Sequence, residues 1–208
     1  MSQKMQETIN SYVTDMQALE EHLEQALSAQ LEALDNDEFR AELRHIHSVT
    51  KQHIETLNEL SERRQGGAQG ISKTIKRAAS SVLGLGAAAI DLVRTEQLPK
   101  NLRDDYAAVS LASIGYVMLH TTALSLGDTE VANVALSHLQ DHARSTMTLH
   151  NIVPRAVIKF LKEDGLPADD SVLSEVGRNI EEVWEAKEGV PETADGTSTG
   201  PSYEENRS

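Results

Sequence analysis

Four long stretches of this chain carry apolar residues at spacings of three and four, which is the pattern of an amphipathic helix. The stretches cover residues 9–34, 38–64, 102–126 and 129–152. Asp35-Asn36-Asp37 separates the first pair, and Gly127-Asp128 separates the second. Because turns this short join helices that run antiparallel side by side, the pattern predicts two helical hairpins.

The link between the two hairpins, residues 65–101, is long enough to run the length of a helical bundle. Its central part, residues 71–94, is rich in alanine, glycine and serine, and we expect a tightly packed helix there. Two antiparallel hairpins joined by one full-length connection define the ferritin-like arrangement. The predicted fold is therefore all-α: a ferritin-like four-helix bundle with a long crossover helix and helical additions at the C-terminal end.

Beyond the fourth stretch, proline and glycine residues divide the chain into shorter pieces. Pro154 is expected to break or kink the fourth helix, so that a short separate helix covers about residues 155–162. Another amphipathic helix is expected at about residues 172–187. Residues 188–208 are polar and acidic with almost nothing to bury, and they predict a disordered tail. Residues 1–187 are accordingly expected to form one helical domain.

The strong negative charge of the chain argues against nucleic acid as a partner. The formal net charge is −14, and an acidic surface repels a phosphate backbone. The most apolar window, residues 78–93, is too short and too polar to span a bilayer, so we expect no membrane span. No signal-peptide pattern is visible, and we expect a cytoplasmic protein.

Histidine is the main source of site chemistry in this chain. There is no cysteine, no local Ser–His–Asp arrangement and no glycine-rich phosphate loop, so we predict no catalytic or cofactor-binding residues. The rise of a helix places several histidines in one layer at the middle of the bundle. The candidate metal ligands are His53, His120, His138, His142 and Asp141, with Tyr116 as a supporting hydrogen-bond partner.

Two interpretations of this layer remain open. In the first, the imidazoles hydrogen-bond to each other and to Tyr116 and determine the register of the helices. In the second, they hold a divalent transition metal such as iron, zinc or manganese. The first is favoured because only one acidic residue, Asp141, stands near the layer, whereas metal sites of this fold are rich in carboxylates.

Short motifs in the four stretches resemble the YciF-type bacterial ferritin-like stress proteins. The motifs are Tyr12–Leu19, Thr50–Leu57 and the run from Tyr116 to Gly127 followed by Glu130 and Ala132. The resemblance covers about residues 12–147. It implies a ferritin-like bundle, a bacterial stress-associated role and a di-iron site built from inward carboxylates.

The chain departs from that family at most of the expected carboxylates. By the resemblance, the carboxylate positions fall on Leu23, Val49, Val109 and Ala112, while His53 and Asp141 are retained. A di-iron site needs about four carboxylates and two histidines. The resemblance therefore predicts the bundle without the standard ferroxidase centre.

We expect a stress-associated, non-catalytic protein with a structural or interaction role. A homo-oligomer is expected, formed through the small-residue helix 71–94 or the helix that carries Trp184, and helix 71–94 is also a candidate surface for a protein partner. The alternative function is a metal-binding or redox protein that uses the inward-facing histidine cluster.

Overall fold

The computed structural model describes residues 1–34, 38–65 and 98–185, and every regular element in these ranges is a helix. The elements are α1 (Gln3–Ala33), α2 (Arg40–Gln65), α4 (Leu98–Ser125), α5 (Thr129–Glu163), the 3₁₀ helix η1 (Asp170–Val172) and α6 (Leu173–Glu185). The all-α prediction is confirmed. Contacts between Cα atoms divide the chain into two units, residues 1–170 and 171–208.

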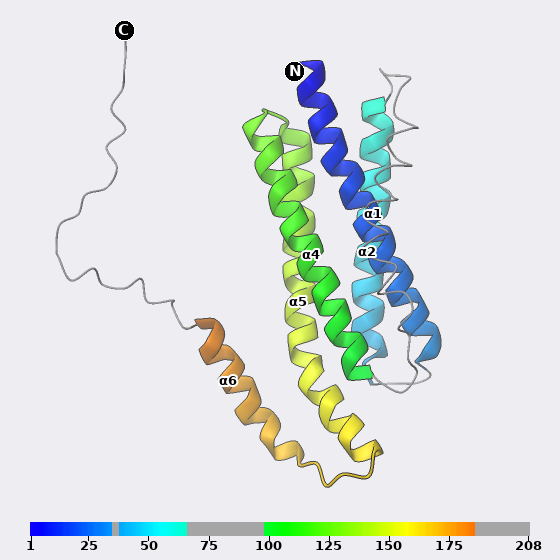
Figure 1. Ribbon diagram of the computed structural model, residues 1–208, viewed down its shortest axis with the longest axis vertical. Coiled ribbons are helices and arrows are strands. Elements are labelled where there is room, and N and C mark those ends of the chain that lie inside the picture. The colour runs from blue at the N-terminus through cyan, green and yellow to red at the C-terminus, as the bar shows by residue number, and fades with distance from the viewer. Residues whose placement is uncertain (35–37, 66–97, 186–208) are drawn as a thin grey trace, which may run out of the picture. The chain divides into compact units, whose positions relative to one another are not determined.

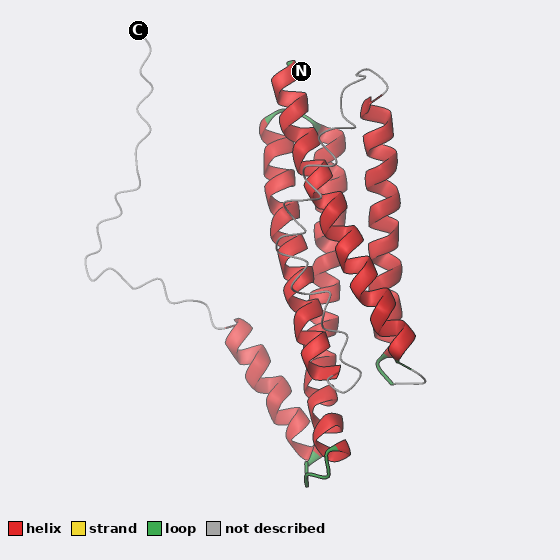
Figure 2. Ribbon diagram, turned by 45° about the vertical axis from the view of Figure 1, so that its right-hand side comes forward, coloured by secondary structure: helices red, strands yellow, loops and turns green. Residues whose placement is uncertain are grey.

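The first unit is a four-helix bundle made of two antiparallel hairpins, α1–α2 and α4–α5 (Figure 1). Helix α1 packs against α2 and α4, and α5 packs against α4 and α2, so α1 and α5 lie on a diagonal. Figures 1 and 2 show that α2 ends and α4 begins at opposite ends of the bundle. This is the predicted ferritin-like topology. The predicted crossover helix 71–94 lies outside the described residues.

The core of the bundle consists of two apolar clusters with polar residues between them. One cluster includes Ile9, Met16, Leu57, Leu119 and Val131, and the other includes Leu23, Leu27, Leu43, Val109 and Leu149. On α1, α2 and α5 the buried positions between these clusters are polar: Glu20, Thr50, His53, His138, His142 and Ser145. The amphipathic stripes thus bury a polar layer in the middle of an aliphatic bundle.

Asp128 begins α5 and also joins the two hairpins. Its side chain accepts a hydrogen bond from the Val131 backbone N–H as the N-cap. Gly127, with φ of 76°, makes the tight turn before it. Arg64, at the end of α2, donates to Asp128 Oδ2 at 2.6 Å and to Asn10 Oδ1 on α1 at 2.7 Å.

We expect Arg64→Met to lower the free energy of unfolding by about 1–3 kcal/mol, because Asp128 then loses a charged partner in a largely buried place. Arg63→Met is the matched control. That guanidinium is 53% exposed and pairs with exposed glutamates, so its loss should change stability by less than about 0.5 kcal/mol. Urea denaturation of both variants measures the difference, and equal losses would contradict the assignment.

The structure corrects the expected end of the fourth helix. Residues 155–162 do not form a separate helix, because α5 continues through Pro154 to Glu163. Proline removes one backbone donor but keeps a helical φ. Ile152 and Ala156, on either side of it, are both buried in the same apolar cluster, and their packing holds the two parts of α5 together.

In the second unit, α6 begins and ends within two residues of the expected helix 172–187. Residues 186–208, which include the predicted tail, lie outside the described residues. The expectation that one helical domain covers residues 1–187 stays a prediction.

Among the described helices, only α4 is long and apolar enough to cross a membrane by length and composition, and 28% of its most apolar window is buried. The inner side of α4 supplies Leu102, Val109, Ala112 and Leu119 to the bundle core.

Candidate metal centre

Glu20 is the centre of the polar layer, and the sequence interpretation passed over it in favour of Leu23. Its side chain is fully buried. Glu20 lies four residues after Met16 and three before Leu23, so it belongs to the same helical stripe as these core residues. The expectation that α1 lacks an inward carboxylate is therefore wrong. Its spacing from Met16 and Leu23 was the signal that could have revealed it.

One oxygen of Glu20 accepts hydrogen bonds from three other helices. Oε1 lies 2.9 Å from His53 Nδ1 on α2, 2.7 Å from Tyr116 Oη on α4 and 2.7 Å from His142 Nε2 on α5. The second oxygen, Oε2, is buried and has no partner, and neither does His142 Nδ1. A buried carboxylate oxygen without a hydrogen-bond donor lowers the stability of the fold. A hydrogen-bond donor or a cation beside Glu20 Oε2 would remove this cost.

His53 lies between two carboxylates. Its Nε2 is 3.2 Å from Asp141 Oδ2, while its Nδ1 faces Glu20. A carboxylate only accepts hydrogen bonds, so only the doubly protonated imidazolium can donate to both. Burial raises the pKa of Asp141, but hydrogen bonds from His53 and Arg144 outweigh it and hold this pKa below its usual value.

The surroundings also shift the pKa values of Glu20, His138 and Tyr116. Burial would raise the pKa of Glu20, but the hydrogen bonds and charges of His142 and His53 lower it to about 2. Burial and the nearby charge of His53 lower the pKa of His138 to about 3, so this imidazole is neutral near pH 7. Burial and Glu20 raise the pKa of Tyr116 well above 10, so the phenol keeps its proton.

These states fix the direction of the hydrogen bonds. Tyr116 donates its hydroxyl proton to Glu20 and accepts from His138 Nδ1 at 2.8 Å. The ring of His138 stacks on the ring of His53, with centroids 3.9 Å apart. His138 thus supports the layer through Tyr116 and His53 and has no direct bond to Glu20.

The structure does not bring His120 into the layer. Its side chain is half-buried, and Nδ1 bonds to the Ala132 carbonyl oxygen at 2.8 Å. On α4 the residue that faces the core is Leu119, one position before His120. Because consecutive residues of a helix point in different directions, His120 lies at the side of the helix, next to α5. Of the predicted site residues, His53, His138, Asp141, His142 and Tyr116 come together, and His120 does not.

Three side chains are placed to hold a metal ion. Glu20, His53 and His142 each offer one ligand atom, and these atoms all lie within 4.8 Å of one another. Two histidines and one carboxylate form a ligand set that proteins use for zinc and for non-haem iron. The contact of His53 with Asp141 also matches the carboxylates that orient metal-bound imidazoles. The donor set and the unpartnered Glu20 Oε2 therefore fit a single divalent ion.

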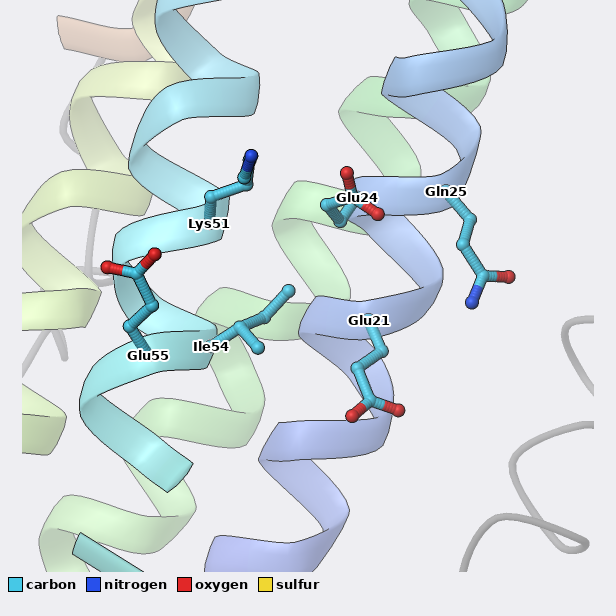
Figure 3. A pocket seen from close by; sticks show the side chains of 6 residues that line it. All are labelled: Glu21, Glu24, Gln25, Lys51, Ile54 and Glu55. Atoms are coloured by element: carbon cyan, nitrogen blue, oxygen red, sulfur yellow. The ribbon is translucent and has the colours of Figure 1, made fainter. Parts of the chain in front are cut away.

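An acidic hollow of about 330 Å³ lies on the surface between α1 and α2. Figure 3 shows its lining residues, Glu21, Glu24, Gln25, Lys51, Ile54 and Glu55, which follow Glu20 on α1 and surround His53 on α2. Glu24 Oε1 lies 2.8 Å from His47 Nε2. The carboxylates make the potential of this surface negative, which raises the local concentration of cations.

A second buried carboxylate, Asp105 on α4, lies outside this layer. Its Oδ1 accepts a hydrogen bond from Gln30 Nε2 on α1 at 2.7 Å, while Asp105 Oδ2 and Gln30 Oε1 have no partner. Burial, with a smaller contribution from Asp104, raises the pKa of Asp105 to about 7 against the hydrogen bond from Gln30. A proton on Oδ2 would supply the donor that Gln30 Oε1 lacks.

The fold and the site define this chain as a ferritin-like helical bundle with a buried histidine–carboxylate layer. The family model of a domain of unknown function, DUF892, matches residues 4–162, and the chain belongs to this family. No curated protein matches the chain. A crystal structure of a protein from Xanthomonas campestris pv. campestris is similar, with 19% sequence identity and a TM-score of 0.62 over 78% of this chain and 99% of that one. At this identity the likeness supports the fold alone.

Proposed function

We propose that this protein binds one divalent transition metal ion, iron, zinc or manganese, through Glu20, His53 and His142. The observation that carries the proposal is the unpartnered Oε2 of Glu20, a fully buried carboxylate that two imidazoles approach. Binding would release the protons of His53 and His142 that now point at Glu20, since a metal ligand must offer a lone pair.

The residues around the three ligands support this assignment. Asp141 would orient His53, and Tyr116, held by His138, would donate a hydrogen bond to Glu20. Three protein ligands leave coordination positions open for water or a small molecule, and a bound iron ion would supply redox chemistry there.

A single ion fits better than a di-iron centre. The positions where the family resemblance places further carboxylates include Val109 and Ala112, which are buried and apolar. Glu20 is the only fully buried carboxylate in the layer among the described residues, with Asp141 at its margin. A two-metal site needs about twice as many carboxylates.

The biological setting is part of the same proposal. The resemblance to the YciF-type stress proteins supports a stress-associated role in the bacterial cytoplasm, and the DUF892 match supports membership of the family alone. We propose a non-catalytic role, in which the bound ion and its ligands stabilise the helical bundle.

Metal analysis of protein purified without an affinity tag tests the proposal. Protein incubated with Fe(II), Zn(II) or Mn(II) and desalted should retain close to one ion per chain. The variant His142→Ala should lose nearly all of the bound metal, because the substitution removes one of the three ligands. His120→Ala is the matched control: it also removes a histidine, but one that bonds to a backbone carbonyl outside the layer, and metal content should not change.

The second candidate function is a metal-free polar network that determines helix register. Its support is the set of three hydrogen bonds that Glu20 Oε1 already accepts from α2, α4 and α5. Wild-type protein that folds without metal and retains none of the three ions would establish this role and end the metal proposal.

A further inference from the structure

Asp105 of α4 and Gln30 of α1 form a polar pair among the residues of the apolar cluster that contains Val109. Their side chains are 2% and 6% exposed. Asp105 stands between Leu102 and Val109 on the buried side of α4, and Gln30 is followed by the buried Leu31 on α1. A charge without a full set of partners is strongly unfavourable in such surroundings. The protonation state of Asp105 therefore affects how well α1 packs on α4.

The pair is complete only when Asp105 carries a proton. Gln30 Nε2 donates to Asp105 Oδ1 at 2.7 Å, while Asp105 Oδ2 and Gln30 Oε1 have no partner. When the carboxyl is ionised, both of these atoms are acceptors, so they cannot bond to each other. A proton on Oδ2 can be donated to Oε1, and the acid and the amide are then joined by two hydrogen bonds in a ring.

Few charged groups surround this pair. On α4 the neighbouring Asp104, which pairs with Arg103, adds a small repulsion against a negative charge on Asp105. The charged and titratable side chains that α2 and α5 bring to this end of the bundle bond elsewhere: Arg40 to two backbone carbonyls at the end of α1, Glu42 to Arg155, and His150 to the hydroxyl of Tyr106. None of them bonds to Asp105 Oδ2, since this atom has no partner.

We propose that Asp105 and Gln30 form a pH-sensitive latch that holds α1 against α4 when the carboxyl is protonated and releases the two helices when it is ionised. After ionisation, two acceptors remain among apolar side chains, and the carboxylate regains hydration if the helices separate locally. The latch is independent of the metal site, because Gln30 lies ten residues after Glu20 on α1, about 15 Å along the helix.

The pH range of the latch follows from the pKa of Asp105 in the closed fold. Burial raises this pKa from 3.8 to about 7, against the hydrogen bond from Gln30 and with a smaller contribution from Asp104. In the open state the carboxyl meets water and regains its ordinary pKa. The closed state binds more protons between these values, so opening becomes more favourable as the pH rises from about 4 to 7 and levels off above 7. The opening equilibrium can rise by on the order of a thousandfold over this range.

Hydrogen–deuterium exchange of the full chain, followed by mass spectrometry, tests the latch. Peptides that cover residues 27–33 and 102–109 should lose protection by about 50-fold or more between pH 5 and pH 8, after correction for the intrinsic exchange rate. Asp105→Asn removes the charge and should reduce this change to less than about threefold. Asp104→Asn is the matched control. It removes a neighbouring carboxylate that is 38% exposed, and it should keep the wild-type response.

Low concentrations of urea separate the latch from global unfolding. A local opening exposes little surface, so at pH 8 the exchange of these peptides should not change between 0 and about 1 M urea, whereas exchange through global unfolding accelerates. Exchange that accelerates with urea as it does in the rest of the bundle would overturn the proposal. Wild-type protection that stays the same between pH 5 and pH 8 would also overturn it, and this result does not depend on the folding of any variant.

Infrared difference spectra detect the proton itself. At pH 6 an ordinary aspartate is ionised, so the spectrum of the wild type minus that of Asp105→Asn should show the carbonyl band of one protonated carboxyl group. The band should disappear by pH 9. A difference spectrum without this band at pH 6 would show that Asp105 is already ionised in the closed fold, and the latch would be excluded.

Discussion

Replacing Glu20 with glutamine is expected to lower the free energy of unfolding by about 3–5 kcal/mol near pH 7, which is the loss typical of breaking a buried ion pair from one side. Glutamine keeps the shape of the side chain and removes its charge. His53 then loses one of the two carboxylates that its ring nitrogens face inside the bundle, and His142 loses a charged acceptor. Urea denaturation followed by circular dichroism measures this loss.

Glu24→Gln provides the matched control one turn further along α1. Glu24 also bonds to a histidine, His47, at 2.8 Å, but its side chain is 26% exposed. Water can replace the lost charge there, so this variant should lose at most about 1 kcal/mol. Similar losses in the two variants would show that burial of Glu20 in the layer does not decide its contribution.

The pH dependence of Glu20 has a definite sign. Its pKa is lowered from 4.5 in the unfolded chain to about 2 in the fold. The folded protein therefore binds fewer protons than the unfolded chain between these values. The stability that Glu20 contributes is fully present above pH 4.5 and is lost as the pH falls toward 2. Glu20→Gln and the wild type should accordingly approach each other in stability in strong acid.

Replacing Asp105 with asparagine is expected to stabilise the protein at pH 8, by on the order of 2–4 kcal/mol. The pKa of Asp105 is raised from 3.8 to about 7. At pH 8 the side chain is therefore a buried charge, and its loss of hydration destabilises the fold. Asparagine has nearly the same shape and no charge. Its amide can accept from Gln30 Nε2 and donate to Gln30 Oε1, which now lacks a partner.

The gain should vanish on acidification. Between pH 4 and 7 the folded protein binds more protons at Asp105 than the unfolded chain does, so wild-type stability rises as the pH falls through 7. At pH 5 the carboxyl is protonated, and the variant should match the wild type within about 1 kcal/mol. Asp104→Asn, which changes a 38% exposed side chain, should show no such dependence. A variant that is less stable than the wild type at pH 8 would contradict the assignment.

Helix periodicity predicted the bundle because burial of an apolar stripe is a local requirement. The stripes of α1, α2, α4 and α5 and the two short turns were sufficient to predict both hairpins and their ferritin-like order. Pro154 misled the prediction of α5, because proline removes one local hydrogen bond while packing around Ile152 and Ala156 acts across helices.

The polar layer was predicted only in part. His53, His138 and His142 interrupt apolar stripes, so their sequence positions alone indicated burial. Glu20 was missed because the family resemblance places the carboxylate position of α1 on Leu23, and His120 was included because helix rise places it in the same layer as the other histidines. One residue along a helix is a rotation of about 100°, and the rotation of each helix about its axis decides which of two neighbours faces inward.

The sequence by itself determined four amphipathic helices, their pairing, and a set of histidines at the buried level of the bundle. Only the tertiary structure decided that Glu20 is the acceptor these histidines share, that His120 lies outside, and that Asp105 is buried against Gln30. The physical reason is that a stripe is a property of one helix. A shared carboxylate oxygen depends on how four helices are rotated and shifted against one another.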